Sequence, residues 1–190
     1  MELTKYIKIY DDCCKPQQIG NFIKYLNNKV TFEDAAVIGT GEKDTVDKSI
    51  RNNGIWTPSE NTLSEIHWLN FYTCIIKHNL FRYQTDLNMP TCSSGINKFS
   101  VLKYKEGGFY KPHVDHHAQA SRNISTIFFL NDDYEGGSFC FKDPSNYEKT
   151  ILEVKPKSAR MIMWPSNFLY PHQANTVIKG VRFAIVAWII

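Results

Sequence analysis

The chain has 190 residues, a length that suits one domain and is short for two. Hydrophobic residues make up 43% of it and charged residues 22%, so the chain can fill a core and is not disordered. The net charge of +3 is too small to indicate nucleic-acid binding, which normally shows a clustered basic face. We therefore expect a single globular domain, residues 1–190, with no nucleic-acid partner.

The location of the protein is suggested by what the sequence lacks. The N-terminal residues MELTKYIK do not have the basic start and long apolar stretch of a signal peptide. No apolar run approaches the roughly 20 residues of a membrane span. Five cysteines without a C-x-x-C pair favour reduced thiols over a disulfide framework or a zinc site. We expect a cytoplasmic protein with no membrane partner.

Two segments in the first half have the spacing of amphipathic helices. Apolar residues recur at helical spacing between Ile19 and Leu26, and Pro16 ahead of them suits a first helical turn. The second segment begins with a capping-box sequence at Thr62–Glu65 and continues at roughly helical spacing to Leu80. We expect these helices to cover one face of a sheet formed by the rest of the chain.

Between the two helices, residues 39–58 form a polar stretch with several glycines and a few isolated apolar residues. One interpretation is a solvated, mobile loop. The other is a flap whose apolar tip and Arg51 cover a site, because such lids come from weakly packed segments. The sequence leaves both interpretations open.

From Lys98 onward the hydrophobic period changes from 3.6 to 2, and turn signals recur at short intervals. The pattern predicts eight strands, at residues 98–105, 110–115, 124–131, 138–142, 150–155, 159–164, 170–174 and 181–189. Short strands with no intervening helix are typical of a jelly roll or a barrel. The expected fold class is mainly β (α+β), with helical support and the lid loop in residues 1–97 and a jelly-roll core in residues 98–190.

Two metal-capable side chains, His113 and Asp115, stand two residues apart in the sequence YKPHVD. On a strand, residues i and i+2 point to the same face, so both would project inward. A third ligand must come from elsewhere, and His172 is the obvious candidate. Two histidines and one carboxylate on one side of a metal leave further positions open, which is the arrangement of non-haem Fe(II) oxygenases.

Arg182 begins a strand that is nearly apolar on both faces, so this arginine is expected to be buried. A buried arginine needs an anionic partner, because an unpaired buried charge is strongly destabilising. Its planar guanidinium suits a carboxylate. That carboxylate is either an internal Asp or Glu or part of a ligand.

The stretch from Tyr104 to Asp115, YKEGGFYKPHVD, resembles the Y-x-x-G-x-x-Y-x-P-H-x-D pattern of prolyl 4-hydroxylases. These enzymes are a branch of the 2-oxoglutarate/Fe(II) dioxygenases. The same pattern continues in order through Arg122–Asn131, the EGG triplet at residues 135–137, and the last twenty residues. The resemblance spans about residues 98–190, whereas the first 95 residues are similar only loosely.

This resemblance implies a double-stranded β-helix, or jelly roll, in which His113, Asp115 and His172 bind Fe(II) and carry the catalysis. It also implies that Arg182 binds the distal carboxylate of the co-substrate 2-oxoglutarate. Tyr104 looks like the family's tyrosine that hydrogen-bonds the co-substrate, whereas Phe129 stands where some relatives have a second tyrosine. The implied reaction hydroxylates a C–H bond with O2, releases succinate and CO2, and is supported by ascorbate.

The expected substrate is a prolyl residue of a protein or peptide. Candidate substrate-contacting residues are Arg51, Tyr110, Arg122 and Trp188. Lysyl or asparaginyl side chains and small molecules are alternative substrates, and a non-catalytic jelly-roll binding module is an alternative function. A cupin-like enzyme is disfavoured because the next glutamate after His113 is Glu135. His116 and His117 are expected at the mouth of the site.

Overall fold

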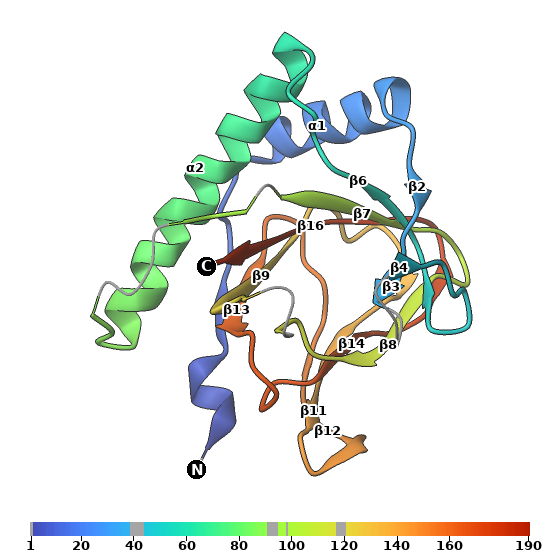
Figure 1. The fold of residues 1–190 in the computed structure, drawn as a ribbon. Coiled ribbons are helices and arrows are strands. Elements are labelled where there is room, and N and C mark those ends of the chain that lie inside the picture. The colour runs from blue at the N-terminus through green and yellow to red at the C-terminus, as the bar shows by residue number, and fades with distance from the viewer. Residues whose placement is uncertain (1, 39–43, 91–94, 98, 117–120) are drawn as a thin grey trace.

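The computed structural model describes residues 2–38, 44–90, 95–97, 99–116 and 121–190 of the chain (Figure 1). Two antiparallel sheets make up most of the structure, and two α-helices lie on the outer side of the larger sheet. The expected mainly β jelly roll with N-terminal supporting helices is confirmed.

The larger sheet has seven strands, and its centre consists of strands predicted from the sequence. In order they are β1 (Lys8–Tyr10), β13 (Met161–Pro165), β9 (Ile124–Phe129), β16 (Arg182–Ile189), β7 (Ser100–Tyr104), β6 (Gly54–Trp56) and β2 (Glu33–Asp34). Almost every residue of β9 and β16 is buried. One face of these strands packs under the helices and the other faces the second sheet, which explains their apolar sequences.

The smaller sheet has five strands. In order they are β12 (Asn146–Val154), β11 (Phe139–Asp143), β14 (His172–Ala174), β8 (Phe109–His113) and β5 (Arg51–Asn52). Two short pairs flank the sheets, β10 (Glu135–Gly136) with β15 (Val177–Lys179) and β3 (Val37–Ile38) with β4 (Asp44–Thr45). All eight predicted strands are therefore present, and β12 begins a few residues earlier than expected.

The two helices are α1 (Pro16–Lys29) and α2 (Leu63–Asp86), with a short 3-10 turn at Leu3–Tyr6 before them. As predicted, Pro16 begins the first helix, and the Thr62 hydroxyl caps the second by accepting from the Glu65 N–H at 3.2 Å. One buried cluster joins both helices to the sheet and includes Phe22, Leu26, Tyr72, Ile76, Phe128 and Ile185. Neither helix in the described part of the chain is long and apolar enough to cross a membrane.

The segment between the helices is more ordered than a solvated loop. Residues 39–43 lie outside the described part of the chain. Beyond them, β5 pairs with β8 in the smaller sheet and β6 pairs with β7 in the larger sheet. The mobile-loop interpretation is therefore wrong for residues 51–56, because main-chain hydrogen bonds hold them in both sheets. Residues 1–97 thus supply strands as well as helices.

The chain passes from one sheet to the other twice at the same corner. Strands β5 and β6 belong to different sheets and are separated only by Asn53, and β7 and β8 are likewise joined across the sheets by residues 105–108. Gly108 lies where these crossings touch: a Cβ there would be 2.8 Å from the Lys105 carbonyl oxygen and 2.9 Å from that of Asn52. The close approach of the two backbones therefore requires glycine.

Candidate active site

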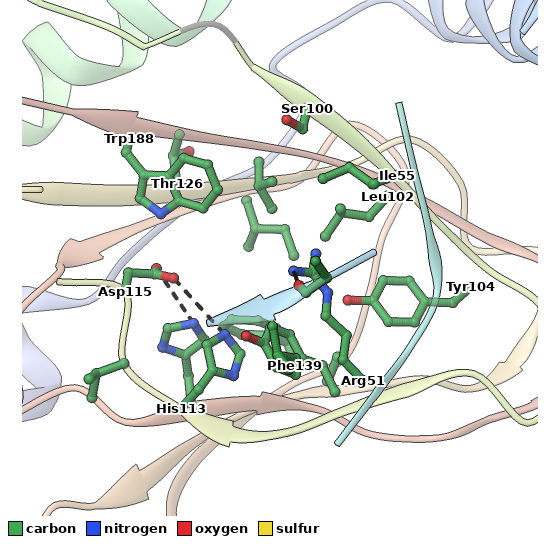
Figure 2. Close-up of a pocket in the computed structure, with 18 of the residues that line it drawn as sticks. Arg51, Ile55, Ser100, Leu102, Tyr104, His113, Asp115, Thr126, Phe139 and Trp188 are labelled. Carbon is green, nitrogen blue, oxygen red and sulfur yellow. Dashed lines mark hydrogen bonds and ion pairs between the residues drawn. The ribbon is translucent and has the colours of Figure 1, made fainter. Parts of the chain in front are cut away.

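A cavity of about 600 Å³ lies between the two sheets (Figure 2). Its walls come from the larger sheet through β7, β9, β13 and β16 and from the smaller sheet through β5, β8, β11 and β14. The expected metal-ligating residues and the buried arginine all line this one cavity; they are His113, Asp115, His172 and Arg182.

Three side chains in the cavity converge in the manner of a metal site. One possible ligand atom from each of His113, Asp115 and His172 lies within 4.8 Å of the others. The two histidines are opposite each other in the β8–β14 register. Figure 2 shows the His113 imidazole facing Asp115. The Asp115 oxygens lie 3.5 Å from His172 Nε2 and 4.0 Å from His113 Nε2.

Asp115 reaches this position in a different way from the one expected. Strand β8 ends at His113, and Asp115 lies in a bend two residues beyond it. The expectation that both residues share one face of a regular strand is therefore wrong. The bend turns the carboxylate back toward the histidines, so the chain still brings the two side chains together.

Backbone contacts fix which nitrogen each histidine presents. The Nδ1 atom of His113 lies 2.8 Å from the Lys111 carbonyl oxygen, and Nδ1 of His172 lies 3.0 Å from that of Tyr170. A proton on Nδ1 donates to these carbonyls and leaves a lone pair on Nε2, directed at the shared centre. Burial, with repulsion from His172, lowers the pKa of His113 to about 3, so this imidazole is neutral at physiological pH.

Asp115 is held as an ionised acceptor. Burial alone raises the pKa of its carboxyl, but the two imidazoles and the hydrogen bonds from Ser125 and Trp188 outweigh burial and lower it. The Ser125 hydroxyl donates to Oδ2 at 2.6 Å and shares a hydrogen bond of 2.7 Å with Ser166. Two imidazole nitrogens and a carboxylate are a donor set that suits a divalent iron-type ion.

Arg182 is fully buried and only partly satisfied by the protein. Its Nη1 donates to the Gly137 carbonyl at 3.0 Å, but its Nε and Nη2 have no partner among the described residues. Its guanidinium lies over the rings of Tyr104 and Phe129, at 4.8 and 5.2 Å from their centroids. Within the described residues no carboxylate pairs with it, so the open donors fit the carboxylate of a ligand in the cavity.

Tyr104 lies beside this arginine, opposite it in the β7–β16 register. Figure 2 shows its hydroxyl pointing into the cavity. Phe129, on β9, is fully buried and has no hydroxyl to add. The polar groups available to a carboxylate at this end of the cavity are therefore those of Arg182 and Tyr104.

The four residues proposed for substrate contact all line the cavity. The Arg51 guanidinium lies 4.6 Å from the Tyr110 ring centroid, and Tyr110 stacks on the His113 ring at 3.5 Å. The Arg122 guanidinium lies 3.8 Å from the Trp188 ring centroid. These side chains therefore form a layer directly against the candidate metal ligands.

The remaining expectations have mixed outcomes. His116 is exposed and its Nδ1 contacts the Arg122 carbonyl oxygen at 3.1 Å, so it lies near the mouth without lining the cavity. His117 lies outside the described residues. Sequence reasoning missed Ser125 and also Phe139, whose ring packs 5.3 Å from that of His172. The polar pair Ser125 and Thr126, inside the otherwise apolar β9, was the available signal for Ser125.

Comparison with known proteins identifies a family for the second half of the chain. Residues 99–190 match the family model of the 2OG-Fe(II) oxygenase superfamily. Prolyl 3-hydroxylase 2 of Homo sapiens is 39% identical over 72 residues, which is 37% of this chain and 10% of that protein. Prolyl 3-hydroxylase 1 of Gallus gallus is 38% identical over 71 residues, with the same coverage. The chain thus spans only about a tenth of the length of these relatives.

Solved structures share the fold over nearly the whole chain. A Trichoplax adhaerens prolyl hydroxylase, solved with a peptide of hypoxia inducible factor, has a TM-score of 0.78 at 18% identity, covering 98% of this chain and 84% of that one. A Pseudomonas putida prolyl-4-hydroxylase has a TM-score of 0.72 at 13% identity, covering 96% and 91%. The second half of the chain is thus similar to the 2OG-Fe(II) oxygenase superfamily, and the fold of nearly the whole chain is shared with solved prolyl hydroxylases.

Proposed function

We propose that this protein is a 2-oxoglutarate- and Fe(II)-dependent dioxygenase that hydroxylates a prolyl residue of a protein or peptide and releases succinate and CO2. One observation carries the proposal: a convergent set of two histidines and a carboxylate shares a cavity with a fully buried arginine that has two open donors. A co-substrate that binds a metal at one end and presents a carboxylate at the other needs both features.

The proposal assigns the metal to His113, Asp115 and His172, whose free Nε2 atoms and ionised carboxylate fit it. Fe(II) bound there with 2-oxoglutarate supplies the oxidising chemistry, in which the keto acid is cleaved and one oxygen atom of O2 enters the substrate. The protein's task is to fix these ligands. The backbone carbonyls behind both imidazoles and the Ser125 hydroxyl behind Asp115 do so.

Arg182 and Tyr104 are assigned to the distal carboxylate of 2-oxoglutarate. Because Arg182 is fully buried, its charge acts in a medium that screens it weakly. A bidentate contact to its open Nε and Nη2 would satisfy both orphaned donors. Phe129 offers no hydroxyl here, so Arg182 and Tyr104 are the residues of this group that can hydrogen-bond the distal carboxylate.

A prolyl target is supported by the named relatives, which are prolyl 3-hydroxylases, and by the structural neighbours, which are prolyl hydroxylases. The substrate is assigned to the wall formed by Arg51, Tyr110, Arg122 and Trp188, beside the metal ligands. Ascorbate as a supporting reductant and a cytoplasmic location stay predictions.

The test begins with binding. Protein loaded with Mn(II) under nitrogen is titrated with 2-oxoglutarate by calorimetry, and protein with Fe(II), ascorbate and air is then assayed for succinate. Failure of the metal-loaded protein to bind 2-oxoglutarate overturns the proposal.

The substrate is identified in a second step. Proteins of a host lysate treated with the enzyme are searched by mass spectrometry for one added oxygen atom on a defined residue. We expect it on proline, and amino-acid analysis then distinguishes 3- from 4-hydroxyproline. An oxygen on lysine or asparagine would keep the reaction and correct the substrate.

A further inference from the structure

Two arginines, Arg51 and Arg122, lie in the wall of the cavity next to the metal ligands. Arg51 comes from β5 at the edge of the smaller sheet, and Arg122 precedes β9 of the larger sheet. Each is stacked on an aromatic ring that itself touches a candidate ligand. Tyr110 under Arg51 stacks on His113, and Trp188 under Arg122 hydrogen-bonds Asp115.

Neither arginine has a carboxylate partner among the described residues. Arg51 donates from Nε to the Asn53 side-chain oxygen at 2.8 Å and from Nη1 to the Ala36 carbonyl at 3.0 Å. Arg122 donates from Nη1 to the Asp115 main-chain carbonyl at 3.0 Å, and its buried Nε has no partner. The partners of both guanidinium groups are thus uncharged oxygens.

The acidic residues near the mouth of the cavity do not pair with Arg51 or Arg122. Glu33 and Asp34 also line the cavity, but both are exposed, and Asp34 forms its ion pair with Lys48 at 2.7 Å. Neither forms an ion pair with an arginine of the wall in the described structure. Burial lowers the pKa of Arg122; the charges of Asp115 and Tyr110 oppose this effect, and the nearby positive charge of Arg51 adds to it.

The proposed function gives no partner to the positive charges of Arg51 and Arg122. A divalent metal ion and Arg182 balance the carboxylate of Asp115 and the two carboxylates of 2-oxoglutarate. Arg51 and Arg122 then remain as two partly desolvated cations with no anion in the loaded site. Holding unpaired, partly buried charges is costly, and an anion supplied by a ligand relieves that cost.

We propose that Arg51 and Arg122 bind a carboxylate of the substrate, close to the residue that is hydroxylated. The inference rests on the proposed function and specifies its substrate class. The guanidinium groups lie over the rings of Tyr110 and Trp188, and the N–H donors that the protein leaves open suit a carboxylate. The carboxylate is either an Asp or Glu side chain beside the target proline or the α-carboxylate of a terminal or free proline.

Short synthetic peptides separate these sources. The probes are acetylated tetrapeptide amides with proline next to Asp, Asn or Lys on either side, an acetyl-Gly-Pro pair ending in a carboxylate or an amide, and free proline. Binding to Mn(II)-loaded protein is measured by calorimetry under nitrogen, with and without 2-oxoglutarate. We expect one carboxylate-bearing probe to bind at least about tenfold more tightly than its neutral match, as a charged hydrogen-bonded pair predicts.

The two possible failures are distinguishable. Equal affinity of every carboxylate probe and its neutral match overturns the inference, even if 2-oxoglutarate binds. A carboxylate preference without any binding of 2-oxoglutarate supports the arginine site and contradicts the proposed function. A preference for the Asp peptide identifies an acidic side chain as the ligand, and a preference for the free carboxylate identifies a chain end.

Substitutions test whether Arg51 and Arg122 cause the preference for a carboxylate-bearing probe. Arg51→Gln and Arg122→Gln are each expected to remove about tenfold of the affinity for the preferred probe and to leave its neutral match unchanged. Arg51→Glu should reverse the preference toward the Lys peptide, which a purely structural role would not do. Asn53→Asp places an internal carboxylate at the Arg51 Nε and should weaken the preferred probe by competition.

The matched control is Lys105→Gln. Lys105 is an exposed lysine that follows β7 and does not line the cavity. Its removal takes away the same charge from the neighbourhood and should leave the preference intact. Circular dichroism and 2-oxoglutarate titration of each variant confirm that the fold and the co-substrate site persist. An unchanged preference in the folded Gln variants contradicts the inference.

Discussion

The carboxylate of Asp115 depends on hydroxyl groups that belong to no expected ligand. Ser125 donates to its Oδ2 at 2.6 Å, and Ser166 hydrogen-bonds Ser125 at 2.7 Å in a fully buried pair. This contact fixes the plane of the carboxylate, which a lone aspartate in a bend does not control. We therefore infer that Ser125 is a positioning residue for the candidate metal site.

Replacing this hydroxyl tests that role. Ser125→Ala should weaken Mn(II) binding by about tenfold or more, the usual cost of losing a group behind a metal ligand. Ser125→Thr keeps the hydroxyl and should restore affinity. Calorimetry of metal binding is the measurement, and Ser145→Ala, at an exposed turn serine, is the control. Undiminished metal affinity in a folded Ser125→Ala protein would contradict the assignment.

At this scale the sequence predicts residues whose chemistry is unusual for their surroundings. Arg182 is such a residue because it begins the otherwise apolar β16, and His113 and His172 are such residues because imidazoles are common metal ligands. Ser125 and Asn53 are ordinary polar residues, and their importance depends on which atoms face them. Those neighbours come from distant strands, and the spacing along one strand does not reveal them.

Helix α2 packs on the larger sheet with two buried tyrosines, and only one of their hydroxyl groups has a hydrogen-bond partner in the described structure. The Tyr72 hydroxyl is buried without a hydrogen-bond partner in the described structure, whereas the Tyr83 hydroxyl donates to the Tyr6 carbonyl at 2.8 Å. A buried polar group without a partner is destabilising by about 1–3 kcal/mol, and a satisfied one contributes about 1 kcal/mol.

These two residues form a matched pair of substitutions. Tyr72→Phe should raise the free energy of unfolding by about 1 kcal/mol, because it removes an unsatisfied hydroxyl and keeps the ring. Tyr83→Phe should lower it by a similar amount, because it leaves the Tyr6 carbonyl unpaired. Urea unfolding measures both. Destabilisation by Tyr72→Phe would show that its hydroxyl has a partner in solution.

Strand β1 is joined to β13 by an ion pair as well as by its backbone. Arg160 donates to Asp11 from Nε at 2.7 Å and from Nη2 at 3.0 Å. These hydrogen bonds hold the pKa of Asp11 at about 2. Because this value is depressed relative to about 3.9 in the unfolded chain, the stabilisation is present above the unfolded value and is lost as pH falls toward 2.

Asp11→Asn should therefore reduce the free energy of unfolding near neutral pH and make no difference once the pH has fallen through this range. Urea unfolding at about pH 6 and about pH 3 measures the difference between variant and parent. Asp12→Asn removes only the longer 3.6 Å contact of an exposed neighbour with Lys157 and should have a smaller effect. A deficit that stays constant between the two pH values would contradict the role of this ion pair.

The length of a strand decides whether its hydrophobic pattern can be recognised in the sequence. Strands of five or more residues, such as β9 and β16, show clear apolar runs and were expected. β5 and β6 have two and three residues, too few to display a period of two. Their pairing with β8 and β7 depends on partners more than 40 residues away, which no local pattern encodes.

The whole molecule should be stabilised in a fixed order by its ligands. The candidate metal ligands come from β8, the bend after it and β14, and Arg182 begins β16 of the other sheet. A metal ion and 2-oxoglutarate bound as proposed would therefore bridge both sheets. A ligand that binds only the folded state stabilises it by about 2.7 kcal/mol at one hundred times its Kd.

Thermal unfolding measures this order. Mn(II) alone should raise Tm, and 2-oxoglutarate should raise it further only when Mn(II) is present. Arg182→Gln should keep the first increase and lose most of the second, because it removes the carboxylate anchor and leaves the metal ligands intact. A full second increase in this variant would remove the role assigned to Arg182.

The order of strands in the sheets was beyond prediction for a related reason. The central neighbours β9, β16 and β7 are far apart in the chain, and many arrangements bury the same apolar faces. The resemblance to prolyl 4-hydroxylases implied the double-stranded β-helix, whereas periodicity alone led only to a jelly roll or a barrel.

At the corner near Gly108 the backbone changes sheet twice, and this arrangement fixes the distance between Arg51 and the candidate metal ligands. Arg51 and Tyr110 pair directly in the β5–β8 register, and His113 ends the same strand, so main-chain hydrogen bonds fix how far Arg51 stands from the metal ligands. The proposed carboxylate site therefore predicts that substrates are selected by the number of bonds between their charge and the carbon to be oxidised. Moving an acidic residue by one position, about 3.3 Å along an extended peptide, should abolish its advantage.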